Sequence, residues 1–325
     1  TMCYTGDILD NDRQKYNIKY YKDLAKELEA TGAHILAIKD MAGILKPQAA
    51  YRLISELKET VDIPLHLHTH DTSGNGIITC SAAVTAGVDI VDVATAAMSS
   101  GTSQPSMSSL YYALENGNRA PELDIDNASQ INHYWEDVRK FYAPFEKGLT
   151  SPQTEVYSHE MPGGQYTNLQ SQATAVGLGL RFDEVKAMYH TVNMMFGDII
   201  KGTPSSKVVG DMALFMVQND LTEEDIYEKG DTLSFPESVI SFFAGDLGQP
   251  VGGFPEKLQK IILKDKPFIT DRPGLHAAPV NFDDVVAELT EKLGYKPGQH
   301  EVLSYILYPQ VFLDYQKMQN EFGSV

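Results

Sequence analysis

The chain has 325 residues, of which 42% are hydrophobic, and a formal net charge of −18 at pH 7. This length is enough for one large domain or two medium domains with a buried core. The acidic balance argues against a surface that binds nucleic acid or an anionic membrane, and we expect neither as a partner. An anionic substrate would therefore need its own metal ion, lysine or arginine at the site.

Cysteine usage and hydropathy narrow the expected compartment. The two cysteines, Cys3 and Cys80, are too few for a disulfide framework and favour a reducing compartment. We expect the cytoplasm, or the mitochondrial matrix if the source is eukaryotic. No apolar run approaches the roughly 18 residues of a transmembrane helix, and residues 1–7 match neither a signal peptide nor a transit peptide.

Residues 1–122 alternate predicted strands with predicted helices. Strands are expected at 2–5, 34–39, 64–71 and 89–94, and they alternate with helices at 15–30, from 47, at 74–86 and from about 105. This repetition predicts parallel strands joined by helices. Polar residues cluster where the strands end, which is where a TIM barrel places its active site.

An open doubly wound sheet would place polar residues in the same way, but no glycine-rich phosphate loop follows any of these strands. We therefore predict an α/β fold in which residues 1–122 form the C-terminal part of a TIM (β/α)8 barrel. A closed barrel needs eight strands and only four are written here. The chain is thus either a fragment that begins inside the barrel or a half that pairs with another chain, and the early first strand favours the fragment.

Residues 123–325 are predicted to form an all-helical domain after a junction at 123–127. The helices with clear apolar faces are expected at 182–200, 206–218, 236–244, 255–263, 283–293 and 310–322. The segment 265–281, rich in Pro, Lys, Arg and Gly, is predicted to be an exposed loop.

The strand at 64–71 carries three histidines in alternation. On a strand, His66, His68 and His70 share one face, with neighbouring same-face positions roughly 7 Å apart. Two imidazoles at that spacing can both reach one metal ion with bonds of about 2.1 Å. His68 and His70 lie nearest the end of the strand and are the predicted metal ligands. The alternative is a polar strand whose histidines are hydrogen-bonded in the core.

Lys39 ends the predicted strand that precedes the histidine strand. Burying an ammonium there favours the neutral, nucleophilic amine. The amine can then form a Schiff base with a carbonyl substrate or a carbamate with CO2, and the carbamate offers oxygen ligands to a metal ion. The neighbouring histidines favour the carbamate, while the alternative is a lysine that extends to solvent from the strand end.

Two segments of the helical region have polar residues suited to a ligand. At 162–168, two glycines allow close backbone approach and Gln165 can offer its amide, although a plain loop with a cap at Thr167 or Asn168 also fits. At 203–207, the start of a helix bearing Ser206 and Lys207 suits a polar or anionic group.

Thr203, just before that helix, has a hydroxyl that can donate and accept a proton, as a proton relay must. Simple capping by Ser205 or Ser206 is the alternative for this segment. His159–Glu160 has no second histidine in register and is expected at the surface. Four methionines have the helical spacing of core residues: Met194, Met195, Met212 and Met216.

Six segments together carry a resemblance to a known family: Ile38–Gly43, Leu67–Gly74, Thr102–Ser106, Pro162–Asn168, Thr203–Lys207 and Gly252–Glu256. The chain resembles the carboxyltransferase domain of the pyruvate carboxylase family over nearly its whole length. The resemblance implies transfer of CO2 from carboxybiotin to the enolate of pyruvate, giving oxaloacetate, in an ATP-dependent enzyme. It also implies partners: biotin on a separate carrier domain, a biotin carboxylase domain of the same enzyme, and further copies in a homotetramer.

The same resemblance assigns roles to residues. Lys39 matches the carboxylated lysine that binds the divalent metal ion, Mn or Zn, with His68 and His70. Thr203 matches the threonine that moves a proton between the methyl group of pyruvate and a biotin nitrogen. The helical domain, residues 123–325, completes the pocket for biotin and substrate, and the matching pocket residues are Gln165, Ser206 and Lys207.

Family residues that precede this stretch of barrel, namely a metal-binding aspartate, substrate-binding arginines and a glutamine, have no counterpart here. The chain alone is therefore expected to be inactive. Three other functions remain open: the carboxyltransferase subunit of an oxaloacetate decarboxylase or transcarboxylase, a Schiff-base aldolase using Lys39, and a helical docking module without chemistry. The segments 103–106 and 252–256 favour the pyruvate carboxylase family.

Overall fold

The computed structural model describes residues 1–13, 15–147 and 149–323. Its contacts divide the chain into two compact units, Thr1–Asp271 and Arg272–Val325, and each is described by itself. In the described ranges, no helix combines the length and the apolar character that a membrane span requires.

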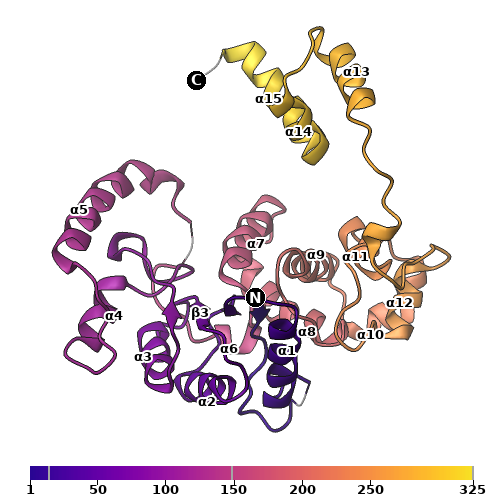
Figure 1. Cartoon of the computed structure of the whole chain (residues 1–325). Helices are drawn as coiled ribbons and strands as arrows, with labels where there is room; N and C mark the ends of the chain where they lie inside the picture. The colour runs from indigo at the N-terminus through magenta and orange to yellow at the C-terminus, as the bar shows by residue number, and fades with distance from the viewer. Residues whose placement is uncertain (14, 148, 324–325) are drawn as a thin grey trace. The chain divides into compact units, whose positions relative to one another are not determined.

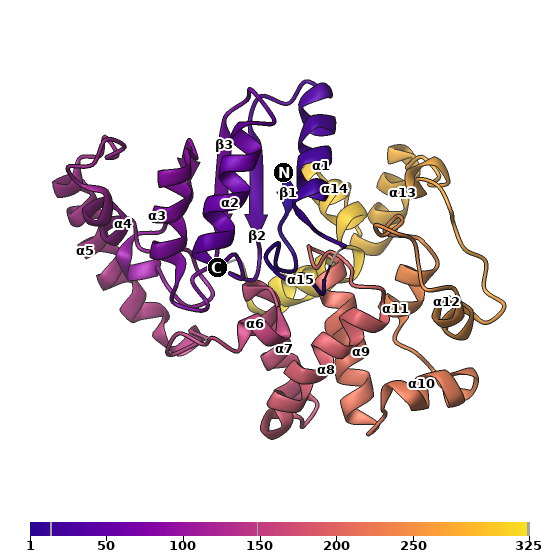
Figure 2. The same ribbon diagram turned by 90° about the horizontal axis from the view of Figure 1, so that it is seen from below.

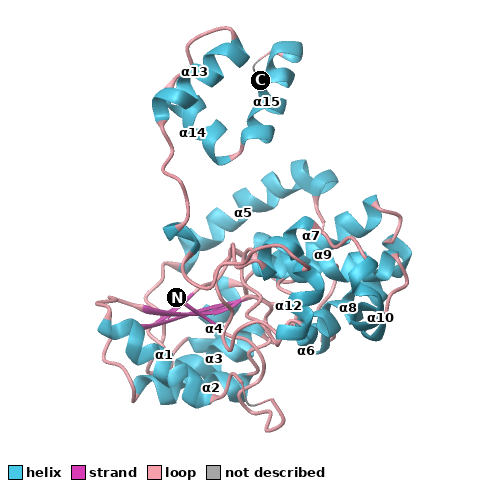
Figure 3. Cartoon of the chain, turned by 90° about the vertical axis from the view of Figure 1, so that its right-hand side faces the viewer, coloured by secondary structure: helices cyan, strands magenta, loops and turns pink. Residues whose placement is uncertain are grey.

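The first part of the larger unit is built from four parallel strands that pair in the order β1-β2-β3-β4, as the sequence predicts. Helices alternate with them along the chain. The elements are β1 Met2–Cys3, α1 Ile18–Ala30, β2 Leu36–Asp40, α2 Pro47–Lys58, β3 Leu65–Thr69, α3 Gly76–Ala86, β4 Ile90–Val91 and α4 Met107–Leu114. Helices α1, α2 and α3 lie along the same side of the sheet (Figures 1 and 3).

Local sequence accounts for these helices. The side chain of Asn17 caps α1 by accepting a hydrogen bond from the backbone N–H of Tyr20. Pro47 begins α2. A backbone N–H at the first position of a helix has no partner within the helix, so proline loses no hydrogen bond there. Gly87 ends α3 in the left-handed conformation at φ 105°. The apolar faces of the helices then pack on the buried face of the sheet to form one core.

From residue 125 to the end of the larger unit, the residues that the structure describes form helices and no strand. They are α5 Ile125–Tyr142, α6 Val156–His159, α7 Gly163–Ala175, α8 Phe182–Met195, α9 Ser205–Gln218, α10 Glu223–Lys229, α11 Glu237–Phe243 and α12 Glu256–Leu263. A second core lies among α7, α8, α9, α11 and α12. In Figure 2 the arrow of β2 points toward α6 and α7, so the helices gather near the C-terminal ends of the strands.

Two expectations for this region are wrong. Helix α7 already begins at Gly163, so Thr167 and Asn168 lie inside it and cap nothing. Met194 is 45% exposed, whereas the other three methionines of the predicted core are buried. The error arises because Met194 sits one position off the apolar face that Met195 shares with its neighbours.

The smaller unit contains α13 Phe282–Leu293, α14 Gln299–Leu307 and α15 Pro309–Phe322, packed around Leu289, Val302 and Phe312. The segment 265–281 before α13 is mostly exposed, as predicted. Helix α5 packs on α4, and the helices up to α12 belong to the same compact unit as the sheet. The domain boundary expected at 122/123 stays a prediction.

Leu53 tests the core beneath the sheet because it is fully buried in α2. We expect Leu53→Ala to lower the free energy of unfolding by about 2–5 kcal/mol, since it removes apolar contacts and leaves a cavity. The measurement is urea unfolding of the purified chain followed by circular dichroism. Leu180→Ala, at a fully exposed leucine, is the matched control and should leave the midpoint within error.

Candidate active site

Four parallel strand ends place chemically active side chains in one row. Lys39 pairs with Cys3 of β1 on one side and with His68 of β3 on the other. Asp92 follows β4, and its backbone N–H donates to the carbonyl of Leu67 at 2.9 Å. Neighbouring strands lie about 4.8 Å apart. The side chains of Lys39, His68 and Asp92 therefore start side by side at the C-terminal ends of their strands.

The alternation predicted for the histidine strand is present. Leu65, Leu67 and Thr69 are buried toward the helices, while His66 and His68 are half-buried on the opposite face. The rings of His68 and His70 are perpendicular neighbours, with centroids 5.3 Å apart. Both predicted metal histidines thus sit together at the end of β3.

Hydrogen bonds fix which nitrogen of each imidazole is free. Nδ1–H of His70 donates to the backbone carbonyl of Thr102 at 2.6 Å, and Nδ1 of His68 lies 2.8 Å from a carboxylate oxygen of Asp92. Because these acceptors require a proton on Nδ1, Nε2 of each ring keeps its lone pair. Metal-binding histidines commonly have this arrangement, with a carbonyl or carboxylate holding the second nitrogen.

Asp92 holds a second histidine as well. The other carboxylate oxygen of Asp92 lies 2.7 Å from Nε2 of His66. His66 therefore contacts Asp92 through Nε2, whereas His68 and His70 use Nδ1 for their hydrogen bonds. Partial burial alone would raise the pKa of Asp92, but the hydrogen bonds from His66 and His68 lower it. Burial lowers the pKa of His70, which favours the neutral ring that a metal ion needs.

The turn behind Lys39 is fixed by a buried carboxylate. Asp40 accepts hydrogen bonds from the N–H of Ile44 at 3.0 Å and of Leu45 at 2.9 Å, and from the hydroxyl of Thr69 at 2.7 Å. Burial raises the pKa of Asp40, although these donors act in the opposite direction. Gly43 follows at φ 72°, where a Cβ would lie 2.3 Å from the carbonyl oxygen of His70. Only glycine fits this close approach.

The donor set suits a divalent metal ion once Lys39 carries a carbamate. In the described ranges, no group of three or more His, Cys, Asp or Glu side chains is arranged to hold a metal ion. A metal ion bound by Nε2 of His68 and of His70 would therefore need an oxygen ligand of another kind. Lys39 lies close enough for its charge to affect the pKa values of Cys3 and His70. A carbamate on its amine would supply that oxygen, and Mn and Zn both accept nitrogen and oxygen ligands.

The start of α7 packs directly on this end of the sheet. The N–H of Gly163 donates to the carbonyl of Met41 at 3.0 Å, and a Cβ at Gly163 would lie 2.9 Å from Nδ1 of His70. Gln165, in the first turn of α7, is buried, and within the described part of the chain its Nε2 has no hydrogen-bond partner. A buried amide donor without a partner is costly, so this position suits a polar ligand.

The segment before α9 reaches the same end of the sheet from the other side. A Cβ at Gly202 would lie 3.8 Å from the sulfur of Cys3, the neighbour of Lys39 across the ladder. Thr203 is exposed, Ser206 is buried, and Lys207 is exposed with an ion pair to Asp211.

The capping role considered for Ser205 and Ser206 is not formed. The residue at the cap position is Pro204, which makes no side-chain hydrogen bond there. The hydroxyl oxygen of Ser205 instead lies 2.6 Å from the carbonyl of Ile200 and 2.9 Å from that of Gly202, so its one proton is shared between these two acceptors. These bonds tighten the turn that carries Thr203.

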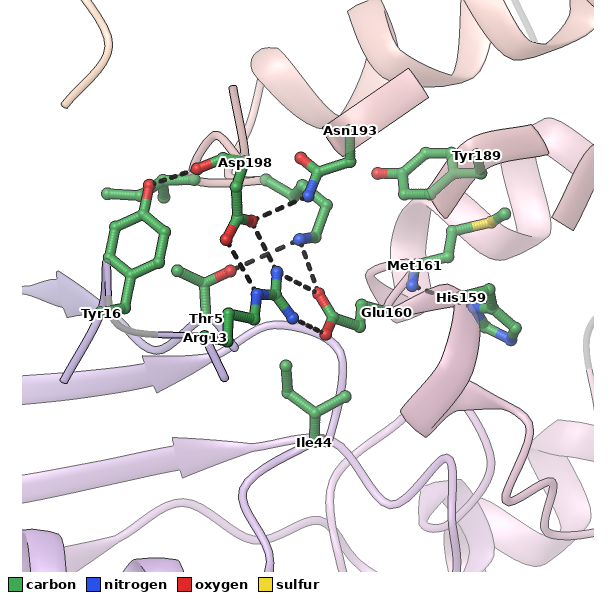
Figure 4. Close-up of polar contacts among 12 residues, drawn as sticks. Thr5, Arg13, Tyr16, Ile44, His159, Glu160, Met161, Tyr189, Asn193 and Asp198 are labelled. Carbon is green, nitrogen blue, oxygen red and sulfur yellow. Dashed lines mark hydrogen bonds and ion pairs between the residues drawn. The ribbon is translucent and has the colours of Figure 1, made fainter. Parts of the chain in front are cut away.

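The expectation that His159–Glu160 lies at the surface is wrong. Both residues are buried, with exposed fractions of 4% and 6%. Glu160 forms ion pairs with Arg13 and Lys201, and Nδ1 of His159 accepts a hydrogen bond from the N–H of Met161 at 3.0 Å (Figure 4). Burial lowers the pKa of His159 to about 4. The partners of Glu160 are far away in sequence, so local spacing gave no sign of them.

Two family matches cover most of the chain. Residues 9–134 match the family described as HMGL-like, and residues 156–325, just over half of the chain, match the family described as conserved carboxylase domain. Pyruvate carboxylase of Bacillus subtilis is 60% identical over 324 residues, which is all of this chain and 28% of that protein. The chain thus spans a little more than a quarter of the length of this curated relative.

Solved structures agree with these matches. The carboxyl transferase domain of Rhizobium etli pyruvate carboxylase superposes with a TM-score of 0.93 at 51% identity, covering 100% of this chain and 55% of that one. The same domain with pyruvate and biocytin gives a TM-score of 0.94 at 51% identity, covering 100% and 54%. This chain therefore belongs to the conserved carboxylase domain family, and its fold is the one that the carboxyltransferase domain of pyruvate carboxylase has.

Proposed function

We propose that this chain forms part of a biotin-dependent pyruvate carboxylase and contributes to the half-reaction that moves CO2 from carboxybiotin to pyruvate, giving oxaloacetate. The observation that carries the proposal is the convergence of Lys39, His68 and His70 at one end of the parallel sheet. The segments of Gln165 and Thr203 pack at the same end. A related domain from Rhizobium etli has been solved with pyruvate and biocytin.

The metal site of the proposal consists of His68, His70 and a carbamate on Lys39. A Mn or Zn ion held there would polarise the keto group of pyruvate and would stabilise negative charge on its oxygen. Asp92 and the carbonyl of Thr102 orient the two imidazoles so that neither ring has to reorganise on binding.

The biotin side of the proposal uses residues of α7 and α9. The amide of Gln165, which has no hydrogen-bond partner among the described residues, offers a donor, and Ser206 and Lys207 add a hydroxyl and a positive charge at the start of α9. The hydroxyl of Thr203 moves one proton between the methyl group of pyruvate and a biotin nitrogen. A closed pocket between these segments and the sheet would keep CO2 from escaping to solvent.

The remaining parts of the proposal concern the whole protein. The biotin carrier and biotin carboxylase domains lie elsewhere in the enzyme, which works as a homotetramer in the cytoplasm or in the mitochondrial matrix. The complete enzyme of Rhizobium etli, 51% identical over this chain, supports such a multidomain arrangement, because this chain covers 32% of it.

Trapping with borohydride separates the carbamate from the Schiff-base alternative at Lys39. We expect that full-length enzyme incubated with pyruvate and sodium borohydride shows no reduced pyruvate adduct, because the proposed chemistry forms no carbon–nitrogen double bond to the lysine. The measurement is peptide mass spectrometry of residues around Lys39. An adduct on Lys39 would support an aldolase and reject the carbamate.

Asp92→Ala tests how His68 is oriented. Loss of the carboxylate frees the His68 ring, and we expect the affinity for Mn or Zn to fall about ten- to a hundredfold. The measurement is metal content and titration by elemental analysis. His66→Gln is the matched control, because His66 contacts the same carboxylate from the same strand but is not a proposed metal ligand. The metal affinity of this variant should stay within about threefold of that of the wild type. Equal loss in both variants would contradict the assignment.

Thr203→Ala tests the proton relay. Because Thr203 is exposed and caps no helix, its removal should leave folding intact while lowering kcat by about a hundredfold or more. The assay is biotin-dependent decarboxylation of oxaloacetate by the full-length enzyme. Thr203→Ser keeps the hydroxyl and should retain much of the activity. Normal turnover in the alanine variant would show that the relay lies elsewhere.

A further inference from the structure

Beside the proposed site, four charged side chains form a buried network that the chemistry above does not use. Arg13 makes two contacts with each of two carboxylates: Nη1 and Nη2 with Glu160, the latter at 3.0 Å, and Nε and Nη2 with Asp198 at 2.8 and 2.5 Å (Figure 4). Lys201 adds a second cation, with Nζ 3.0 Å from Glu160 and 3.4 Å from the hydroxyl of Thr5. The network thus holds two positive and two negative charges.

The network is well enclosed and well supported. The side chains of Glu160 and Asp198 are each 8% exposed, and that of Lys201 is 2% exposed. Asn193 of α8 donates to Asp198 at 3.0 Å. The main-chain carbonyl of Asp198 accepts hydrogen bonds from the hydroxyl of Tyr16 at 2.7 Å and from Nζ of Lys15 at 3.0 Å. Arg13, Lys15 and Tyr16, which follow β1, therefore bind Asp198 through both its side chain and its backbone carbonyl.

Both carboxylate residues have unusual backbone angles. Glu160 has φ 52° and Asp198 has φ 53°, in the left-handed region that residues other than glycine seldom occupy. Such conformations persist where the surroundings over-determine them, and they cluster at functional sites. Arg13 supplies that constraint for both residues at once, because its planar guanidinium matches carboxylates through paired hydrogen bonds.

The two turns fixed in this way lead into the two segments that approach the strand ends. Glu160 lies three positions before Gly163, whose Cα is packed against His70, and five before Gln165. Asp198 and Lys201 come just before Gly202 and Thr203, beside Cys3. A network that served stability alone would gain little from buried charge over apolar packing. Its position at the base of both segments points to a role in placing them.

We propose that Arg13 is a positioning residue for the carboxyl transfer, because its guanidinium holds Glu160 and Asp198 together and thereby sets the Gln165 and Thr203 segments over the strand ends. The inference rests on the proposed function for the roles of Gln165 and Thr203. Arg13 itself contacts neither substrate nor biotin in this account.

The test replaces Arg13 by lysine in the full-length enzyme. Lysine keeps the charge but, as a point charge, cannot hold two carboxylates in a fork. In biotin-dependent oxaloacetate decarboxylation we expect kcat to fall about ten- to a hundredfold and the KM for biotin to rise severalfold, because small displacements of positioned groups cost that much. The KM for oxaloacetate should stay within about twofold, since the strand ends that hold Lys39, His68 and His70 are not part of the network.

A matched control exists in the same chain. Arg181 also bridges two carboxylates, those of Glu184 and Asp220, but it does so on the surface. Arg181→Lys should leave kcat, both KM values and the melting temperature unchanged. If Arg13→Lys behaves like Arg181→Lys in a folded enzyme, the positioning role is overturned.

Hydrogen exchange gives a readout that needs no turnover. In Arg13→Lys, backbone amides of 160–165 and 198–204 should exchange faster, while those of 36–40 and 65–69 keep their wild-type rates. Faster exchange spread over the whole chain would mean a merely structural role and would overturn the proposal. If the wild-type enzyme shows no biotin-dependent activity, the proposed function fails, and this exchange pattern still decides whether Arg13 places the two segments.

A second variant guards against a failure to fold. Glu160→Gln keeps the shape of the side chain and leaves Arg13 paired with Asp198. In this variant we expect a lower kcat and faster exchange of the backbone amides of 160–165. The exchange rates of 198–204 should change less. Wild-type kcat and exchange in folded Glu160→Gln would contradict the role of the network.

Discussion

Five consecutive residue pairs join β2 to β3 in parallel, from Leu36 with Leu65 to Asp40 with Thr69, and the site depends on this ladder. Parallel pairing brings the C-terminal ends of both strands to one edge, so Lys39 and His68 become neighbours although 29 positions separate them. A shift of one residue would turn one of the two side chains toward the helices. Such a shift is unfavourable because it would also move buried leucines or the buried isoleucine from the helix side to the opposite face of the sheet.

Close packing of two glycines fixes the position of His70, which follows the last paired residue of β3. His70 lies between Gly43 and Gly163, each so close that a side chain would collide with the backbone or ring of His70. Its ring is also tied to the carbonyl of Thr102. His70 is thus held by contacts from three separate segments, because Gly43 packs on its backbone while Gly163 and Thr102 contact its ring. A side chain with so little freedom would lose little conformational entropy on binding the proposed metal ion.

Much of this arrangement could be predicted from the sequence because the signals are local. Alternating histidines, apolar strand bodies and the spacing of strands and helices indicate the parallel sheet, the face of His68 and His70 and the place of Lys39. The start of α7 could not be predicted with the same certainty, because Pro162 offers no side-chain cap and two glycines follow it. The positions of Glu160 and Asp92 were missed for another reason. The role of each depends on partners that lie on other elements, and neither belongs to a periodic pattern in the sequence.

Gln165 and Gly210 show how a proposed binding residue depends on a neighbour that carries no functional group. A Cβ at Gly210 would lie 2.5 Å from the amide nitrogen of Gln165, so even alanine at this position on α9 would push that amide out of its place on α7. The room available to the Gln165 side chain is thus set by the neighbouring helix. If Gln165 binds biotin as proposed, a larger residue at position 210 would alter the fit of that ligand while every proposed polar contact residue stays the same, and a comparison restricted to the polar residues would overlook it.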